Sequence, residues 1–210
     1  MDTTRFNLDR IHTARDTEEL AERYGQMAQN YDDSLQGEWG WTPPEYIADV
    51  FSRYVARDSR ILDAGVGTGL VGEALVTRGY SDLLGIDISK AMMQKAREKG
   101  VYRELHLMEL GETLKFSNDF FDAVIAVGVM AIGHAPAHAL DELVRITKPG
   151  GHLIYTLRPV VYENKGFKEK HAALEALGKW KLMERTDLFV PMPKREPDFY
   201  YEVWVYEVVE

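Results

Sequence analysis

A short apolar segment that ends in an acid and runs into three alternating glycines constrains this chain more than any other feature. The segment is Ile61-Leu-Asp-Ala-Gly-Val-Gly-Thr-Gly69, and a helical run from Leu70 to Arg78 follows it. Glycines at this spacing let the backbone turn sharply after a strand and let a ligand lie against the main chain. The next helix directs free N–H groups toward the same place. The pattern therefore predicts a nucleotide-like ligand at a strand–turn–helix junction.

Two kinds of nucleotide ligand fit this loop. Gly67, Gly69 and Gly72 match the dinucleotide pattern, in which the loop holds a pyrophosphate. Asp87, after the next apolar segment, would then bind a ribose. Asp63 favours the other kind, because a carboxylate at that position would repel a pyrophosphate and suit a ligand with an ammonium group. Asp-x-Gly-x-Gly-x-Gly after a first strand is the pattern of S-adenosylmethionine enzymes, which we favour over the dinucleotide and over a loop without a ligand.

Composition and charge limit the class of protein. The chain has 210 residues, 45% of them hydrophobic, which suffices for one α/β domain with a substantial core. Cysteine is absent, which excludes disulfides, thiol nucleophiles and thiolate metal sites. Residues 1–19 are polar and no long apolar segment follows, so we expect a soluble, cytoplasmic protein. The formal net charge of −9 opposes binding to nucleic acid or an anionic membrane, and we expect neither partner.

From residue 60 onward, short apolar segments alternate with helical patterns, which is typical of parallel strands joined by helices. The expected strands are 60–64, 83–87, 104–108, 121–127 and 152–157. Ser89 is a candidate N-cap, Pro136 can open the helix before the last of these strands, and Lys148-Pro-Gly-Gly151 predicts a tight turn into that strand.

The two ends of the chain have different patterns. Residues 168–177 are expected to form a helix, and 181–190 and 199–208 are expected to be strands joined by a proline-rich connector. Two late strands joined in this way indicate an antiparallel pair at one edge of the sheet. The residues before 60 are helical in pattern, and Thr42-Pro-Pro-Glu45 predicts a capping box at the start of one helix.

Together these features resemble the class I S-adenosylmethionine-dependent methyltransferases. The resemblance rests on Asp63 to Gly69, Gly85-Ile-Asp-Ile-Ser89, Phe121-Asp-Ala-Val124, Lys148-Pro-Gly-Gly151 and the late strand pair. Within that superfamily the chain looks closest to the Williams–Beuren syndrome region methyltransferase-like branch, through motifs such as Lys99-Gly-Val-Tyr102 and Arg145-Ile-Thr-Lys-Pro-Gly-Gly151.

The resemblance implies a single domain with a Rossmann-like α/β fold. Its sheet would have seven mostly parallel strands, helices on both faces and an antiparallel C-terminal edge pair. Residues 1–59 would form a helical lid, 60–158 the cofactor-binding core, and 159–210 a C-terminal helix and strand pair.

The same resemblance implies where S-adenosylmethionine, and its product S-adenosylhomocysteine, would bind. The glycine loop, including Gly65, Gly67, Thr68 and Gly69, would lie under the methionine part, with Asp63 near its ammonium group. Asp87 would accept hydrogen bonds from the ribose hydroxyls.

Other positions would hold the adenine and the sulfonium. Ile88 and Met92 would flank the adenine. The family often has an acid or amide after the third strand for the adenine amino group; here Met108, Glu109 and Leu110 stand at that place, so either Glu109 or the backbone of Leu110 would make the contact. Val127 would lie beside the sulfonium.

Methyl transfer is an in-line displacement, so holding the nucleophile and the methyl group in line can lower the barrier by roughly 7–11 kcal/mol. No catalytic triad is required, although a base would assist transfer to an alcohol, phenol or amine acceptor. His134, in the loop after the fourth strand, is the candidate base, with a surface histidine as the alternative. We expect no catalytic metal.

Aromatic residues of the expected lid are further candidates. Tyr24 and Tyr31 could contact the sulfonium through their ring faces or simply pack their helix onto the core. Trp41 and Met130 are candidates for the wall of a substrate pocket.

Four functions remain open from the sequence, the last of them a dinucleotide-dependent oxidoreductase, which Asp63 and the late strand pair oppose. The first, which the acidic charge and the expected single compact domain favour, is methyl transfer to a small molecule on O, N or S. The second is methylation of a protein, and the third is a binding protein that holds the cofactor without turnover. The sequence does not indicate the oligomeric state.

Overall fold

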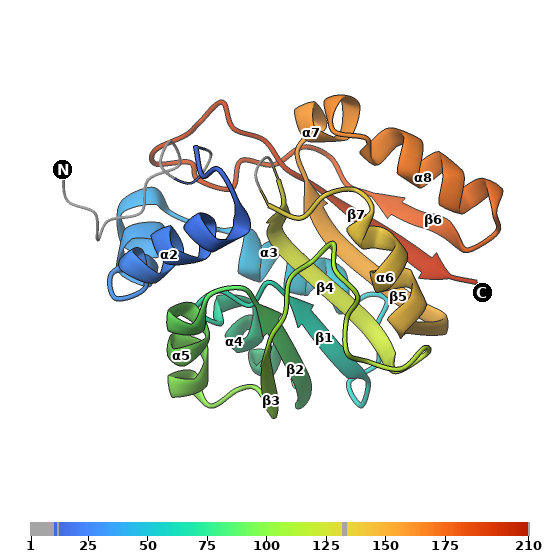
Figure 1. Cartoon of the computed structure of the whole chain (residues 1–210), viewed down its shortest axis with the longest axis horizontal. Coiled ribbons are helices and arrows are strands. Elements are labelled where there is room, and N and C mark those ends of the chain that lie inside the picture. Colours follow the sequence, from blue (N-terminus) through green and yellow to red (C-terminus); the bar gives the residue numbers. More distant parts are fainter. Residues whose placement is uncertain (1–10, 12, 132–133, 210) are drawn as a thin grey trace.

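Seven strands form one sheet in the order β3-β2-β1-β4-β5-β7-β6 (Figure 1). The computed structural model describes residues 11, 13–131 and 134–209. The strands are β1 (Arg60–Ala64), β2 (Asp82–Asp87), β3 (Glu104–Leu107), β4 (Phe121–Met130), β5 (Thr147–Leu157), β6 (Trp180–Arg185) and β7 (Glu202–Val208). The pairs among β1 to β5 are parallel, whereas β7 is antiparallel to both β5 and β6. The predicted mostly parallel sheet with an antiparallel edge pair is confirmed.

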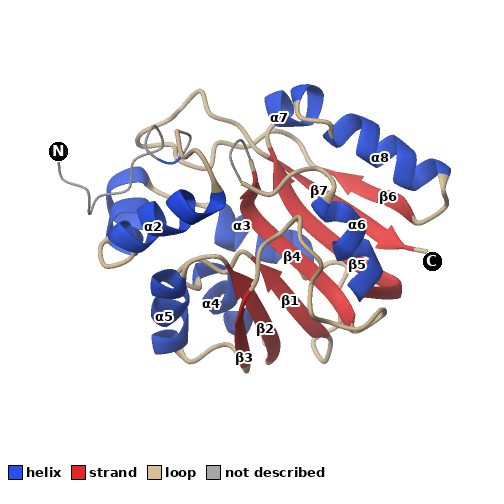
Figure 2. Ribbon diagram, viewed as in Figure 1, coloured by secondary structure: helices blue, strands red, loops and turns tan. Residues whose placement is uncertain are grey.

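Helices cover both faces of the sheet, because its central strands are apolar on both sides (Figure 2). Helices α3 (Pro43–Phe51) and α4 (Leu70–Thr77) pack on one face, and α6 (Ala139–Ile146), α7 (Pro159–Asn164) and α8 (Phe167–Ala176) on the other. Helix α5 (Lys90–Lys99) follows β2. Helix α2 (Thr17–Met27) and the π-helix η1 (Asp33–Trp39) lie in the segment that the sequence analysis expects to be a lid, and we call this segment the lid below.

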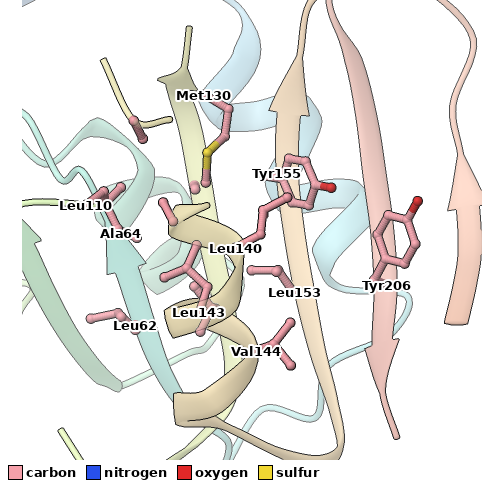
Figure 3. Packing of buried hydrophobic residues seen from close by; sticks show 14 of the residues in the cluster. Leu62, Ala64, Leu110, Met130, Leu140, Leu143, Val144, Leu153, Tyr155 and Tyr206 are labelled. Carbon is pink, nitrogen blue, oxygen red and sulfur yellow. The ribbon is translucent and has the colours of Figure 1, made fainter. Parts of the chain in front are cut away.

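The larger core cluster lies between the sheet and α6. Leu140, Leu143 and Val144 of α6 lie over Leu62 and Leu153 of the sheet (Figure 3). All five are at most 6% exposed. Burying side chains of this size stabilises the fold by roughly 1.5–3 kcal/mol each. The packing of α6 therefore holds the strands, and with them their carboxyl ends, in place.

Several predicted helix boundaries hold and others do not. The Ser89 side chain accepts from the Met92 N–H as the N-cap of α5, as predicted. The capping box at Thr42 is wrong: its hydroxyl donates to the carbonyls of Val190 and Pro191 instead, so it ties the lid to the proline-rich connector. Pro136 does not open α6. The Ala139 N–H donates to the carbonyl of Pro136 and closes a turn, and α6 begins only at Ala139.

The C-terminal half also departs from expectation in detail. Lys148 to Gly151 lie inside β5 rather than in a turn before it, and they form an irregularity in the pairing with β4. Both late strands are shorter than predicted, and β6 ends at Arg185. The short helix α7, which the sequence analysis missed, starts at Pro159.

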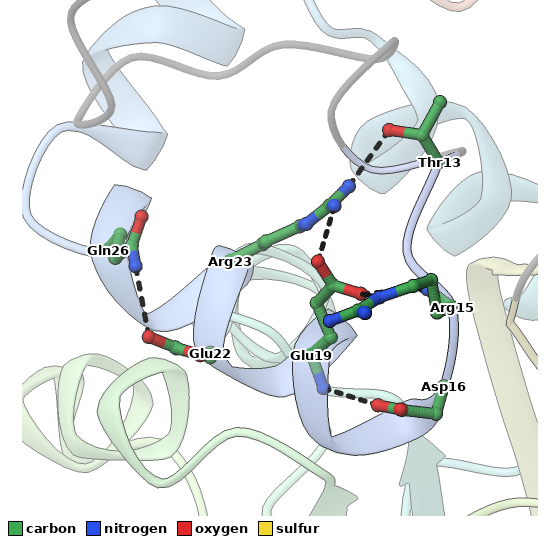
Figure 4. A network of polar contacts seen from close by, with 7 residues as sticks. All are labelled: Thr13, Arg15, Asp16, Glu19, Glu22, Arg23 and Gln26. Carbon is green, nitrogen blue, oxygen red and sulfur yellow. Dashed lines mark hydrogen bonds and ion pairs between the residues drawn. The ribbon is translucent and has the colours of Figure 1, made fainter.

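Lid helix α2 is held at its start by its own polar side chains (Figure 4). The Asp16 carboxylate caps the helix by accepting from the Glu19 N–H at 2.8 Å. The Glu19 carboxylate in turn accepts from Arg15 and Arg23. These contacts, the Arg15 hydrogen bond foremost, lower the pKa of Glu19 to about 2. The part of the lid at residues 1–10 and 12 lies outside the described residues.

His171 of α8 is a buried histidine that faces the edge of the sheet. The hydroxyls of Tyr155 and Tyr206 lie 2.6 Å from Nε2 and 3.0 Å from Nδ1 of His171. Burial, and then the charge of Arg185, lower the His171 pKa to about 3. Its ring is therefore neutral at physiological pH. None of the described helices is both long enough and apolar enough to cross a membrane.

Candidate functional site

A cleft of about 740 Å³ opens at the carboxyl ends of β1 to β4, beneath lid helix α2. In open α/β sheets ligands bind at this edge, where the chain order reverses, and here that point lies between β1 and β4. Most of the predicted cofactor residues line the cleft: Tyr24, Tyr31, Gly65, Gly67, Asp87, Ile88, Met92, Met108, Glu109, Leu110 and Val127. The strand order thus brings together side chains from four separate strand ends.

The glycine loop forms the floor of the cleft. Gly65 has φ +92°, and a Cβ there would lie 2.3 Å from Cγ2 of Val129, so no other residue fits. Gly67 has φ +53°, and a Cβ there would meet no atom within 4 Å. Gly67 therefore turns a bare stretch of main chain toward the cleft, as a ligand that lies against the backbone requires.

Asp87 fixes this loop from the end of β2. Its Oδ2 accepts from the Gly67 N–H at 2.9 Å, and its Oδ1 accepts from the Ser89 N–H at 2.8 Å. Burial raises the pKa of Asp87, although these backbone hydrogen bonds oppose the shift. Because a carboxylate can accept about four hydrogen bonds, Asp87 retains the capacity to accept two more from a ligand in the cleft.

Asp63 lies beneath the loop rather than on the cleft wall. It is 0% exposed, and its Oδ2 accepts from the Tyr102 hydroxyl at 2.5 Å while Oδ1 is buried without a partner. The same hydroxyl accepts from the Gly72 N–H at 3.1 Å. Burial raises the Asp63 pKa to about 7, with the Tyr102 hydrogen bond opposing it. Asp63 thus joins the loop to the segment before β3, and its place near an ammonium group stays a prediction.

The segment after β3 contributes a polar and an apolar wall. The Thr17 hydroxyl donates to Oε1 of Glu109 at 2.6 Å, which connects the first turn of α2 to this wall. Glu109 keeps its other carboxylate oxygen for a ligand. Met108 and Leu110 line the cleft beside it, opposite the apolar side chains that follow β2.

Thr68 and Gly69, which were expected to bind the cofactor, lie outside the lining. The Thr68 side chain is 2% exposed, and its hydroxyl donates to Asp32 of the lid. Asp32 also pairs with Nζ of Lys99 in α5 at 2.9 Å. Gly69 caps α4 in a left-handed conformation against Ala96. These residues hold the lid and the helices in place around the cleft.

A second cavity of about 530 Å³ adjoins the first. The two cavities share the lining residues Tyr24, Tyr31, Val127, Gly128 and His134. The predicted pocket residue Trp41 lines this second cavity, and its ring packs edge-on against Tyr201. The other predicted pocket residue, Met130, does not: it is 1% exposed in the core beneath α6, with Val124 and Ala126 of the same strand.

The sequence analysis missed several lining residues. In the first cavity these are Thr17, Leu20, Ile86, Val129 and Ala135. In the second they include Arg158, which directly follows β5, and Phe199 and Tyr201, which lie just before β7. Arg158 directly follows the apolar β5, and a charged residue at a strand's carboxyl end was the available signal. Nothing in the pattern indicated that the aromatic residues turn toward the cleft.

Fold, glycine loop and cleft together define an α/β protein with a cleft at the switch point of its sheet, where proteins of this fold class bind their ligands. The methyltransferase-domain family model matches residues 62–155. Human methyltransferase-like protein 27 is 33% identical over 182 residues, which cover 81% of this chain and 73% of that protein. The chain belongs to the class I S-adenosylmethionine-dependent methyltransferases.

Further relatives agree with this family. The ubiquinone biosynthesis O-methyltransferase of Alkalilimnicola ehrlichii is 34% identical over 119 residues, 53% of this chain and 46% of that protein. An S-adenosylmethionine-dependent methyltransferase of Methanosarcina mazei has the same fold, with a TM-score of 0.61 at 17% identity over 76% of this chain and 97% of that one. The chain thus spans most of the human relative and about half of the bacterial O-methyltransferase.

Proposed function

We propose that this protein transfers a methyl group from S-adenosylmethionine to a small molecule, on an oxygen, nitrogen or sulfur atom. The observation that carries the proposal is the contact between two cavities of different chemistry. One contains the glycine loop and Asp87, and the other is lined mainly by aromatic and apolar side chains. They meet at Val127, Gly128 and His134.

The first cavity suits the methyl donor. Asp87 retains acceptor capacity for two ribose hydroxyls, and charge-assisted bonds of this kind are the stronger ones. Ile88, Met92 and Leu110 form apolar walls for a purine. The open main chain at Gly67 leaves room for the amino-acid part. When bound, the cofactor supplies an electrophilic methyl group on a sulfonium.

Charge and enclosure favour a small acceptor. The formal net charge of −9 opposes nucleic acid as a partner. The second cavity reaches the donor site between the lid and the strand pair, and its walls come from both. One relative is named for O-methylation in ubiquinone biosynthesis, which is consistent with oxygen as the acceptor atom.

The chain contributes to catalysis mainly through position and exclusion of water. Val127 and Gly128, at the junction, would hold the reacting centre between the two cavities. Tyr24 and Tyr31 close the junction from the lid, where a water-poor setting favours transfer to an anionic nucleophile. His134 would take the proton from an alcohol, phenol or amine acceptor.

Methyl transfer from labelled S-adenosylmethionine tests this function. We would incubate the protein with a panel of small phenols, amines and thiols, and with a cell extract fractionated into small molecules and proteins. Label in a small molecule, lost in the Asp87→Ala variant, is the expected result. Label in proteins alone would indicate a protein methyltransferase. Cofactor binding without transfer to either fraction would indicate a binding protein and contradict the proposal.

A further inference from the structure

Arg158 is a half-buried cation of the second cavity and has no carboxylate partner among the residues that the structure describes. It directly follows β5, and its guanidinium carbon lies 3.9 Å from the centroid of the Phe199 ring. Within the described part of the chain it forms no ion pair and donates no side-chain hydrogen bond. Other arginines do: Arg185 pairs with Glu202 at 2.8 Å, and Arg78 pairs with Asp49 at 2.7 Å.

The surroundings of Arg158 do not neutralise its charge. Every described residue that lines the second cavity is apolar, aromatic or small, apart from Arg158 and His134. The carboxylates that line the first cavity, Asp87 and Glu109, do not line the second. Burial lowers the pKa of Arg158, yet a guanidinium stays charged at neutral pH. A positive charge with unused donors therefore faces this cavity in a chain whose overall charge is negative.

The position of the guanidinium favours a planar anion. One of its faces lies against Phe199, so its N–H groups remain available in the plane of the group. A carboxylate meets a guanidinium in that plane through two parallel hydrogen bonds. Trp41 and Tyr201 provide aromatic walls that can cover a ring attached to such a carboxylate.

We propose that Arg158 binds the carboxylate of an aromatic carboxylic acid, and that acids of this class are the methyl acceptors of the enzyme. The inference rests on the proposed function and names its substrate class. The acid's carboxylate would pair with Arg158, and its nucleophilic atom would lie toward Gly128 and His134, where the two cavities meet. A phosphate dianion suits the cavity less well, because Arg158 is the sole lysine or arginine among the described lining residues.

Binding measurements separate this proposal from the proposed function. We would titrate the protein, alone and with S-adenosylhomocysteine, with benzoate, 4-hydroxybenzoate, cinnamate and indole-3-acetate, with the neutral amide of each, and with phenyl phosphate. At least one acid is expected to bind about tenfold or more tightly than its amide, because each good ion pair to a carboxylate is worth over 1 kcal/mol. This comparison does not depend on methyl transfer.

Variants test whether Arg158 is the cause. Arg158→Met should abolish the preference for the acid, whereas Arg158→Lys should keep part of it. Arg195→Met is the matched control, since Arg195 also lies over an aromatic ring, Trp39, but outside both cavities. The melting temperature of each variant checks that it folds. If Arg158→Met does not fold, the comparison is made with Arg158→Lys.

Four outcomes would overturn the proposal. They are equal affinities for acids and amides, a preference that survives Arg158→Met, tighter binding of phenyl phosphate than of every acid, and no binding of any acid at millimolar concentration. If the wild-type protein preferred the acids to their amides but did not bind S-adenosylhomocysteine, the proposed function would be contradicted instead.

Discussion

The hydroxyl of Tyr24 lies 2.7 Å from Nε2 of His134, and this contact joins lid helix α2 to the loop after β4. The two rings also pack edge to face, with centroids 5.7 Å apart. Burial raises the pKa of Tyr24 well above its ordinary value, so the hydroxyl keeps its proton. Because both residues line both cavities, the contact lies where donor and acceptor would meet.

Replacing His134 should slow methyl transfer without weakening donor binding. For an acceptor that must lose a proton, His134→Ala is expected to lower kcat by about 100-fold, as removal of a general base does. S-adenosylhomocysteine affinity should change less than about threefold. Tyr24→Phe removes only the hydroxyl that orients the ring and should have a smaller effect in the same direction.

His138→Ala is the control for this prediction. His138 is exposed and its Nε2 contacts the carbonyl of Gly111, away from the cavities. Turnover should be unchanged in that variant. If His134→Ala also left turnover unchanged, His134 would have no part in proton transfer.

Asp32 connects the lid to the core, so its removal should loosen the lid. It accepts from the Thr68 hydroxyl and pairs with Lys99. Burial by itself would lower the pKa of Lys99, but hydrogen bonds to Glu73 and Asp32 raise it on balance, so the amine stays charged. In Asp32→Asn, hydrogen exchange should become faster in residues 17–39 and stay unchanged in β1. The control is Asp33→Asn, at the adjacent exposed residue. If hydrogen exchange in residues 17–39 were equally fast in both variants, Asp32 would not hold the lid.

The hydroxyl of Tyr102 should matter for stability more than that of Tyr54, although each donates to a carboxylate. Tyr102→Phe leaves the buried Asp63 and the Gly72 N–H without their partner. We expect a loss of about 1–3 kcal/mol in the free energy of unfolding, the cost of unsatisfied buried groups. Tyr54→Phe removes a bond to the half-exposed Glu184 and should cost less than about 1 kcal/mol. Chemical denaturation of both variants checks the difference, and equal costs would contradict it.

His171 should make the fold less stable as the pH falls. Its pKa is about 3 when folded, against an ordinary value of 6.5. Between these values the unfolded chain binds a proton that the folded chain does not, so stability decreases toward acid by about 1.4 kcal/mol per pH unit. From about pH 7 to about pH 5 the wild type should lose roughly 2 kcal/mol more than His171→Phe. Urea titrations at both pH values measure this, and parallel losses would show that His171 does not titrate as described.

The sequence was sufficient for the sheet and for half of the site. Apolar strands that alternate with helical patterns fix the layers, and the glycine spacing with Asp87 locates the first cavity, because these signals are local. The contact between Asp63 and Tyr102 was not predicted, because Tyr102 lies 39 residues further along the chain and nothing in the pattern pairs them. The interpretation of Thr42 failed for the same reason, since its acceptors belong to the distant proline-rich connector.

The second cavity could not be predicted because its walls meet only in three dimensions. Trp41 comes from the lid and Arg158 from the position after β5. Phe199 and Tyr201 come from the segment just before β7. Each is unremarkable in its own stretch of sequence. Their common role follows from the antiparallel pairing of β5 with β7, which brings the last of these segments beside the switch point.

The most direct test of the central claim is calorimetric titration of the wild type, Asp87→Ala and Asp82→Ala with S-adenosylhomocysteine. Asp87 lies at the cleft end of β2, whereas Asp82 lies at the other end and pairs with Arg60 and Arg103. We expect binding to the wild type, a loss of at least about 2 kcal/mol, or roughly 30-fold, in Asp87→Ala, and no change in Asp82→Ala. Equal affinity in all three proteins would contradict the assignment of the cleft as the cofactor site.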